Sequence, residues 1–185
     1  VRAYHRYCAQ QNQTVTRIDP EIVTSNVLGL QIVYHKLSRF GHVLGLTCML
    51  PVQIQVFDDV EHPVYEPLDG RTVFVDESLR SENANIGRHN FTLMHEACHL
   101  VYGMLYPETY LGVQRRVYYS LRFAPRNVTP DWEEWRTNML ASAVLMPKDL
   151  ILQYMQEYGL GKKMRMVNRI FAARQYEAFS QIADK

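Results

Sequence analysis

The sequence predicts an α+β protein, and three stretches of it carry that prediction. A helix-start signal stands at Asp19-Pro20, and short β-rich segments then fill residues 30–79. Helical patterns of apolar residues follow Arg88. Because strands and main helices occupy separate stretches instead of alternating, the pattern favours α+β over a parallel α/β fold. Hydrophobic residues make up 47% of the 185 residues, enough to bury a core of ordinary size.

The first helix is expected to begin at Pro20, after a peripheral N-terminal segment of residues 1–18. Asp19 can accept hydrogen bonds from the first backbone N–H groups of this helix, and proline suits its first position. Gly29 suits the end of the helix, because glycine readily adopts the left-handed conformation found there.

β-branched and aromatic residues, which favour strands, are concentrated in the block that follows. They form segments separated by short polar, glycine or proline breaks: residues 30–37, 42–50, 52–57 and 72–79. The stretches SRFG and PLDG between them are typical of turns. We therefore expect a small, mostly antiparallel sheet of three or four strands.

Apolar residues recur at helical spacing after Arg88, in the stretch HNFTLMHEACHLVYGML, with Asn90 as the expected N-cap. Residues 107–131 are punctuated by prolines and are expected to form a long, partly helical surface insertion. A further helix should begin after Asp131, whose side chain can cap it, and acidic residues in its first turn suit the helix dipole. Pro147 ends that helix.

Pro147 also starts the next helix, which Gly159 ends. Residues 161–185 are expected to form a closing helix, whose cationic side chains are interpreted as a solvated face. We expect one domain over residues 19–160, packed as a sheet against a helical bundle, between the N-terminal segment and this closing helix.

Composition argues against several classes of function. The formal net charge is +1, which argues against direct nucleic-acid binding and against a membrane-surface role. No apolar run approaches the roughly 20 residues of a membrane span, and we expect no membrane partner. The 3 cysteines are widely spaced and odd in number, which argues against a disulfide framework and favours a cytoplasmic location. Nothing in the sequence indicates the oligomeric state.

The stretch HEACH, residues 95–99, has the H-E-x-x-H pattern of a zinc site. On a helix His95 and His99 lie on the same face, where both imidazoles can bind one zinc ion. Glu96 is rotated by about 100° from His95, which suits a general base for water at that zinc rather than a ligand. Cys98 is rotated away from both histidines and is expected to pack in the core.

A catalytic zinc takes a third protein ligand, and no third histidine follows His99 at a suitable spacing. The ligand should then be a carboxylate on a later helix. The candidates are Glu108, Asp131, Glu133, Glu134, Asp149 and Glu157. Glu133 and Glu134 are favoured, because they open a helix whose apolar body should be buried beside the metal helix. The residues alone do not separate these two.

Two stretches taken together resemble a known family. NFTLMHEACHL, followed by EWRTNMLASAVLMP, is similar to the ImmA/IrrE-type metallopeptidases, the domain of unknown function 955 group. The family pattern, aligned backwards from the M-P pair, places its glutamate on Glu134, and Asn138 matches as well. The chain departs from the family at Asn90, where the family has arginine, at Cys98, where it has glycine, and in the 107–131 insertion.

The resemblance implies a zinc endopeptidase with a zincin-like fold, in which Glu96 activates water and three residues hold the zinc: His95, His99 and Glu134. It also implies a bacterial, phage or mobile-element setting and a protein substrate, a helix-turn-helix transcriptional repressor whose cleavage relieves repression. A further segment is then expected after residue 185. The alternative is a non-catalytic regulatory binding module, whose structural or vestigial metal site helps it hold a repressor without cutting it.

Further side chains are candidates for a role beside the metal. Tyr102, on the same helix face as the histidines, could donate a hydrogen bond to the oxyanion of the intermediate. Asn138, one turn after Glu134, could bond to that carboxylate. Tyr118 and Tyr119 could reach the site from the insertion.

Overall fold

A computed structural model describes residues 1–58, 62–110, 117–122, 131–159 and 180–182. The chain divides into two compact units, one of Val1–Ile18 with Met146–Lys185 and one of Asp19–Leu145. Five of the six described strands come before the long helix at residues 86–105, and only the strand at residues 117–121 follows it, so the predicted α+β class is confirmed. Most of the closing helix expected over residues 161–185 lies outside the described residues. Among the described helices, none combines the length and the hydrophobicity that crossing a membrane requires.

The first unit contains helix α1 (Arg2–Gln10) and helix α6 (Lys148–Glu157). Pro147 stands at the N-cap of α6, and Gly159 follows its end with a positive φ of 69°, as the sequence predicted. The Tyr154 hydroxyl donates to the Thr16 carbonyl at 2.7 Å, which joins α6 to the segment after α1.

The second unit opens with helix α2 (Pro20–Ile22), which continues into the π-helical turn η1 (Val23–Val27). The Asp19 carboxylate accepts from the backbone N–H groups of the first turn, and Gly29 has a positive φ of 68° just after the helical residues. Both predicted boundaries of this helix are therefore confirmed.

A four-stranded sheet follows, made of β1 (Gln31–His35), β2 (Val43–Cys48), β5 (Thr72–Asp76) and β6 (Val117–Leu121). The strand order is β1-β5-β2-β6. β1 runs parallel to β5, whereas β2 is antiparallel to both of its neighbours. The sheet is therefore mixed, and its parallel pair was not predicted, because β1 and β5 are joined through three intervening strands.

A separate two-stranded sheet pairs β3 (Val52–Phe57) with β4 (Pro63–Leu68). β3 was predicted, but β4 was not, because its sequence PVYEPL carries two prolines. Proline is tolerated there because β4 is paired on one side only among the described strands. β6 was also missed, because it lies within the proline-punctuated stretch read as an insertion.

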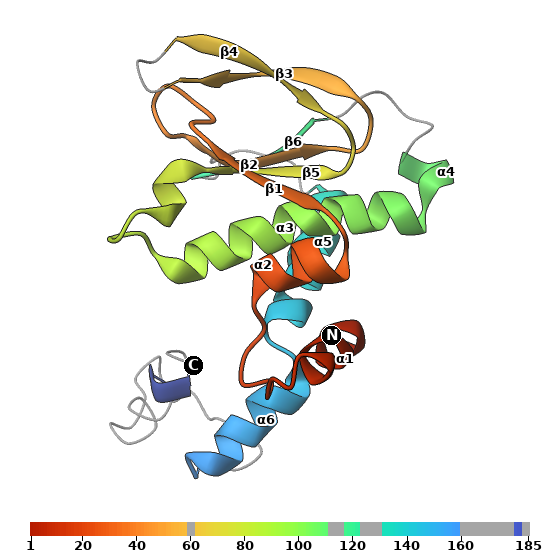
Figure 1. The fold of residues 1–185 in the computed structure, drawn as a ribbon, viewed down its shortest axis with the longest axis vertical. Helices are drawn as coiled ribbons and strands as arrows, with labels where there is room; N and C mark the ends of the chain where they lie inside the picture. The colour runs from red at the N-terminus through yellow and green to blue at the C-terminus, as the bar shows by residue number, and fades with distance from the viewer. Residues whose placement is uncertain (59–61, 111–116, 123–130, 160–179, 183–185) are drawn as a thin grey trace. The chain divides into compact units, whose positions relative to one another are not determined.

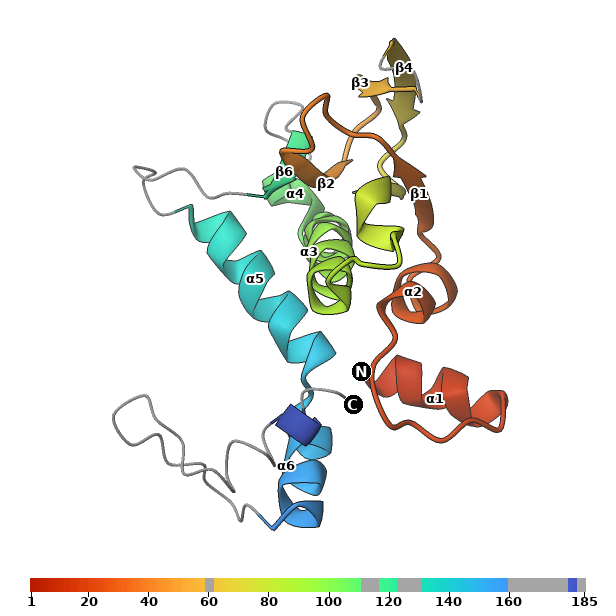
Figure 2. The same cartoon turned by 90° about the vertical axis from the view of Figure 1, so that its left-hand side faces the viewer.

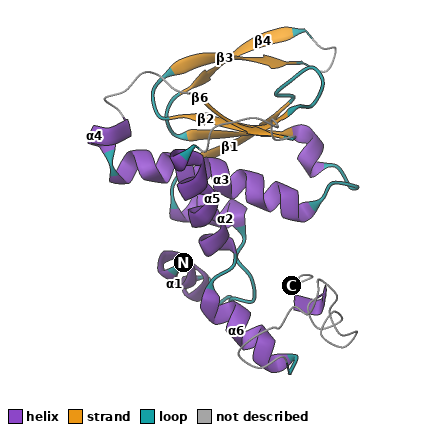
Figure 3. Cartoon of the chain, turned by 180° about the vertical axis from the view of Figure 1, so that it is seen from behind, coloured by secondary structure: helices purple, strands orange, loops and turns teal. Residues whose placement is uncertain are grey.

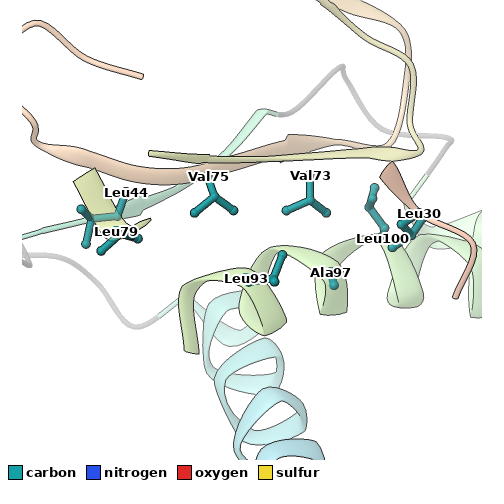
Figure 4. Close-up of a cluster of buried hydrophobic side chains, with 8 residues drawn as sticks. All are labelled: Leu30, Leu44, Val73, Val75, Leu79, Leu93, Ala97 and Leu100. Atoms are coloured by element: carbon teal, nitrogen blue, oxygen red, sulfur yellow. The ribbon is translucent and has the colours of Figure 1, made fainter. Parts of the chain in front are cut away.

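The four-stranded sheet lies between helix α3 (Ile86–Leu105) and the β3–β4 pair, as Figures 1 and 3 show. β5 is buried on both faces. Val73 and Val75 point toward Leu93 and Ala97 of α3 (Figure 4), whereas Phe74 packs in the cluster on the other face. Each such buried side chain stabilises the fold by about 1.5–3 kcal/mol. This packing holds α3 against the sheet.

Helix α3 begins earlier than the sequence predicted. Its N-cap is Asn85, whose side chain accepts from the Arg88 backbone N–H at 2.9 Å, so the expectation of Asn90 as the cap is wrong. The first three residues of the extra turn, Ile86, Gly87 and Arg88, are exposed, and the apolar periodicity that marked the helix starts only after this turn. From Thr92 to Leu100 every residue is buried.

Helix α5 (Trp132–Leu145) lies beside α3 (Figure 2). The Asp131 carboxylate accepts from the backbone N–H of Glu133 at 2.9 Å and of Glu134 at 3.4 Å, which confirms the predicted cap. Ala141 is fully buried, which allows the close approach of the two helices. Within the expected insertion, the structure describes a short helix, α4 (Pro107–Tyr110), and β6; the rest lies outside the described residues.

Candidate metal centre

His95 and His99 lie one turn apart on the buried face of α3. Their exposed fractions are 4% and 1%, and their ring centroids are 4.7 Å apart at an interplanar angle of 82°. The two Nε2 atoms are 3.0 Å from each other. The predicted pairing of the two imidazoles on one helix face is therefore present.

Glu134 brings a carboxylate to the same point from the first turn of α5. Its Oε2 atom is 3.1 Å from His95 Nε2, and its Oε1 atom is 3.5 Å from His99 Nε2. Among the described residues, His95, His99 and Glu134 form a group that could hold a metal ion, with ligand atoms all within 4.8 Å of one another. Glu133, the other candidate from this turn, is not in the group.

Each imidazole also has a partner at its second ring nitrogen. His95 Nδ1 is 3.0 Å from Oδ1 of Asn138, and His99 Nδ1 is 3.4 Å from Oγ1 of Thr137. An amide oxygen only accepts, so His95 Nδ1 carries a proton and its Nε2 atom serves as the ligand. Asn138 thus contacts an imidazole, whereas the sequence suggested contact with the carboxylate of Glu134.

The spacing of these ligand atoms fits a metal ion. Tetrahedral zinc with bonds of about 2.0–2.1 Å separates its ligand atoms by about 3.3 Å, close to the measured 3.0, 3.1 and 3.5 Å. Without metal, the acid–base pairing holds the group together. Burial alone would raise the pKa of Glu134, but its hydrogen bonds with His95 and His99 hold that pKa well below its usual range. A cation can replace the shared proton.

Glu96 lies beside the ligand group and is not part of it. Its side chain is fully buried, and burial raises its pKa to about 7, although His95 and the hydrogen bond from Ser120 act to lower it. Oε1 accepts from the Ser120 hydroxyl at 2.6 Å, whereas Oε2 has no hydrogen-bond partner in the described structure. One carboxylate oxygen is therefore held, and the other is left for a water or a substrate.

Gly45 of β2 makes room for Glu96. A Cβ atom at this position would lie 2.7 Å from Thr92 Cγ2 and 2.9 Å from Glu96 Cγ. Real side chains do not come so close, so α3 can press Glu96 against the sheet only because β2 has glycine there.

β6 contributes two side chains from one of its faces. The Tyr118 ring stacks on His99, with centroids 4.0 Å apart and an interplanar angle of 23°. Ser120 reaches Glu96 from the same face, and Tyr119 between them is exposed. Tyr118 was a candidate from the sequence, whereas Ser120 was not; the β-branched and aromatic residues of VYYSL are the signal that could have indicated a strand there.

The remaining candidates lie elsewhere. The Tyr102 hydroxyl donates to the Arg136 carbonyl at 3.3 Å, so it joins α3 to α5. Cys98 is buried, which raises its pKa to about 12, as expected of a packing residue. The other carboxylates considered as ligands are also outside the group: Glu108 on α4, Asp131 at the cap of α5, and Asp149 and Glu157 on α6.

Comparison with models of protein families, with curated proteins and with solved structures finds no match to this chain. Function is therefore inferred from the site and from the sequence motifs.

Proposed function

We propose that the protein is a zinc-dependent endopeptidase. One observation carries the proposal: two imidazoles and a carboxylate converge within 4.8 Å beside a buried carboxylate that is not among them. The three converging groups are a known ligand set of catalytic zinc, which leaves a fourth position open. The separate carboxylate, Glu96, is then placed to act on a molecule in that position.

Zinc is favoured over iron by the presence of Glu96. Two histidines and one carboxylate also hold iron in oxygenases that react with dioxygen. A buried carboxylate next to a ligand has no required part in that chemistry, whereas hydrolysis needs a base for water. Bound zinc would lower the pKa of a water molecule and polarise a carbonyl group.

In this proposal, each residue of the site has a separate role. His95, His99 and Glu134 would hold the zinc ion, and Asn138 would fix the ring of His95. Glu96 Oε2 takes a proton from the attacking water and gives it to the nitrogen of the leaving amine. Burial raises the pKa of Glu96 to about 7 in the metal-free protein, and a zinc ion beside it would lower that pKa and favour the ionised form that accepts the proton.

The sheet supports a peptide as the substrate. β6 ends the strand order and, among the described residues, pairs only with β2. Its other edge offers backbone N–H and C=O groups to which an extended peptide can add as a further strand. Ser120 and Tyr118 of the same strand contact the site, so a peptide on this edge would lie beside it.

The narrower proposal, a helix-turn-helix repressor as the substrate, rests on the sequence resemblance. Incubation of the zinc-loaded protein with the repressor encoded beside its gene tests it, and fragments are expected. Binding without fragments would support the alternative of a non-catalytic regulatory module.

Cleavage of peptides tests the activity itself. We expect zinc-loaded wild type to cut members of a mixture of unstructured synthetic peptides, with products identified by mass spectrometry. The Glu96→Gln variant should keep its zinc and lose activity by about 10²–10⁴-fold, because glutamine cannot accept the proton. Undiminished cleavage by that variant would refute the assigned mechanism.

A further inference from the structure

Ser120 is the residue outside the metal group that contacts the proposed base directly. Its hydroxyl donates to Glu96 Oε1 at 2.6 Å, across 24 positions of sequence. We propose that Ser120 is a positioning residue, which holds Oε1 of Glu96 so that Oε2 faces the reacting water. This inference rests on the proposed peptidase function and assigns a role that none of the sequence motifs indicated.

The asymmetry of the carboxylate supports this role. Oε1 accepts from the Ser120 hydroxyl at 2.6 Å. Oε2 is equally buried and has no partner within the described part of the chain. A carboxylate turns readily about its last bond, because that torsion is broad. A donor on one oxygen opposes this rotation and determines which oxygen remains available.

The neighbouring strand closes the other side of Glu96. Ser120 is paired with Gly45 in the β2–β6 register, and a Cβ atom on Gly45 would lie 3.1 Å from Glu96 Oε1. The Glu96 side chain therefore lies against both residues of this pair. Ser120 donates a hydrogen bond to it, and Gly45 leaves space for it. Among the described residues, no other side chain donates a hydrogen bond to this carboxylate.

Among the described residues, the same strand pairs on one side only, and a peptide substrate would add on its other edge. Ser120 thus belongs both to the proposed peptide-binding strand and to the support of the base. A substrate paired with β6 would lie against the strand that holds Glu96 in its working orientation.

Three variants test the role of the hydroxyl. Ser120→Ala removes it, Ser120→Thr keeps it on a β-branched side chain that suits a strand, and Ser81→Ala is the control. Ser81 is an exposed serine whose hydroxyl donates to the Ser78 carbonyl, away from the site. The substrate is the synthetic peptide that wild type cleaves fastest. Zinc content and thermal midpoint are measured for every variant.

We expect Ser120→Ala to lower kcat by about 10–100-fold, the range typical of lost supporting contacts. KM and zinc content should stay near those of wild type, because no ligand is removed, whereas the thermal midpoint should fall by about a few degrees, because Oε1 of the buried carboxylate loses its donor. Ser120→Thr should recover most of kcat. A wild-type kcat in Ser120→Ala, or equal losses in the alanine and threonine variants, would overturn the proposal.

A binding measurement separates this proposal from the peptidase function. Acetohydroxamate is titrated into the cobalt-loaded proteins and followed by visible absorption, since its hydroxyl proton needs a nearby base. Binding should weaken by about tenfold in Ser120→Ala and recover in Ser120→Thr. Unchanged binding in Ser120→Ala would overturn the positioning role. If wild type cleaves no peptide, the peptidase proposal fails, and this titration alone decides the role of Ser120.

Discussion

Glu96 is the residue on which the proposed chemistry depends. Its carboxylate is fully buried, and Oε2 has no partner among the described residues. Burial of such a group costs stability unless a partner compensates. Residues that reduce stability in this way are concentrated at functional sites, where their perturbed pKa serves the chemistry.

That cost predicts how the stability of the zinc-free protein depends on pH. The pKa of Glu96 rises from 4.5 to about 7 on folding. Between these values the folded state keeps a proton that the unfolded state has released, so the free energy of unfolding falls as pH rises. Above pH 7, the free energy of unfolding of wild type should have fallen by up to about 3 kcal/mol relative to that of Glu96→Gln. At low pH, Glu96 is protonated in both states and no such loss is expected.

Urea unfolding of the zinc-free wild type and of Glu96→Gln at about pH 4, 6 and 8 measures this difference. A stability difference that is the same at all three pH values would contradict the raised pKa of Glu96.

Helix α5 decides which of two adjacent acids becomes a ligand. Glu134 lies on the helix face that also carries Thr137 and Ala141, both buried, and its carboxylate meets both histidines. Neighbouring residues on a helix differ by about 100°, so Glu133 cannot share that position.

Two matched variants test this assignment. We expect wild type to hold about one zinc per chain and Glu134→Ala to lose it, because a site of two ligands binds zinc much more weakly. Glu133→Ala should keep it. Elemental analysis after dialysis measures both, and full zinc occupancy in Glu134→Ala would contradict the assignment.

The contact between α3 and β2 depends on Gly45. We expect Gly45→Ala to destabilise the protein by about 1–3 kcal/mol, because its methyl group would overlap Thr92 and Glu96. The variant should also cleave peptides more slowly, since relief of the overlap moves Glu96. An unchanged urea midpoint together with unchanged activity would show that the strand and helix have more room than the structure indicates.

The local part of the site could be read from the sequence. The spacing of His95 and His99 on a helix, the position of Glu96 and the cap at Asp131 all follow from short-range rules. The split between Glu133 and Glu134 could not be resolved in this way, because it depends on the rotation of α5 against α3.

The contribution of β6 to the site could not be predicted from the sequence for a related reason. Ser120 meets Glu96 only because β6 pairs with β2, more than 60 residues earlier by the register Gly45↔Ser120. The prolines in the sequence on both sides of β6 led its stretch to be interpreted as an insertion, and the two prolines of PVYEPL likewise hid β4. Strand pairing over such separations leaves little trace in local composition.

At the scale of the whole molecule, the metal ligands, the proposed base and its supporting residues all belong to the unit Asp19–Leu145. Within it, α3 lies between the sheet and α5, with hydrophobic packing on the sheet side and the ligand group on the α5 side. The sheet thus supplies support for Glu96, and α5 supplies the third ligand.

X-ray absorption at the zinc edge identifies the ligands of the proposed metal centre. For the zinc-loaded wild type, we predict two imidazole nitrogens at about 2.0–2.1 Å, oxygen ligands at similar distances, and no sulfur. A sulfur ligand at about 2.3 Å, which would indicate a cysteine such as Cys98, or a zinc ion without imidazole ligands, would contradict it.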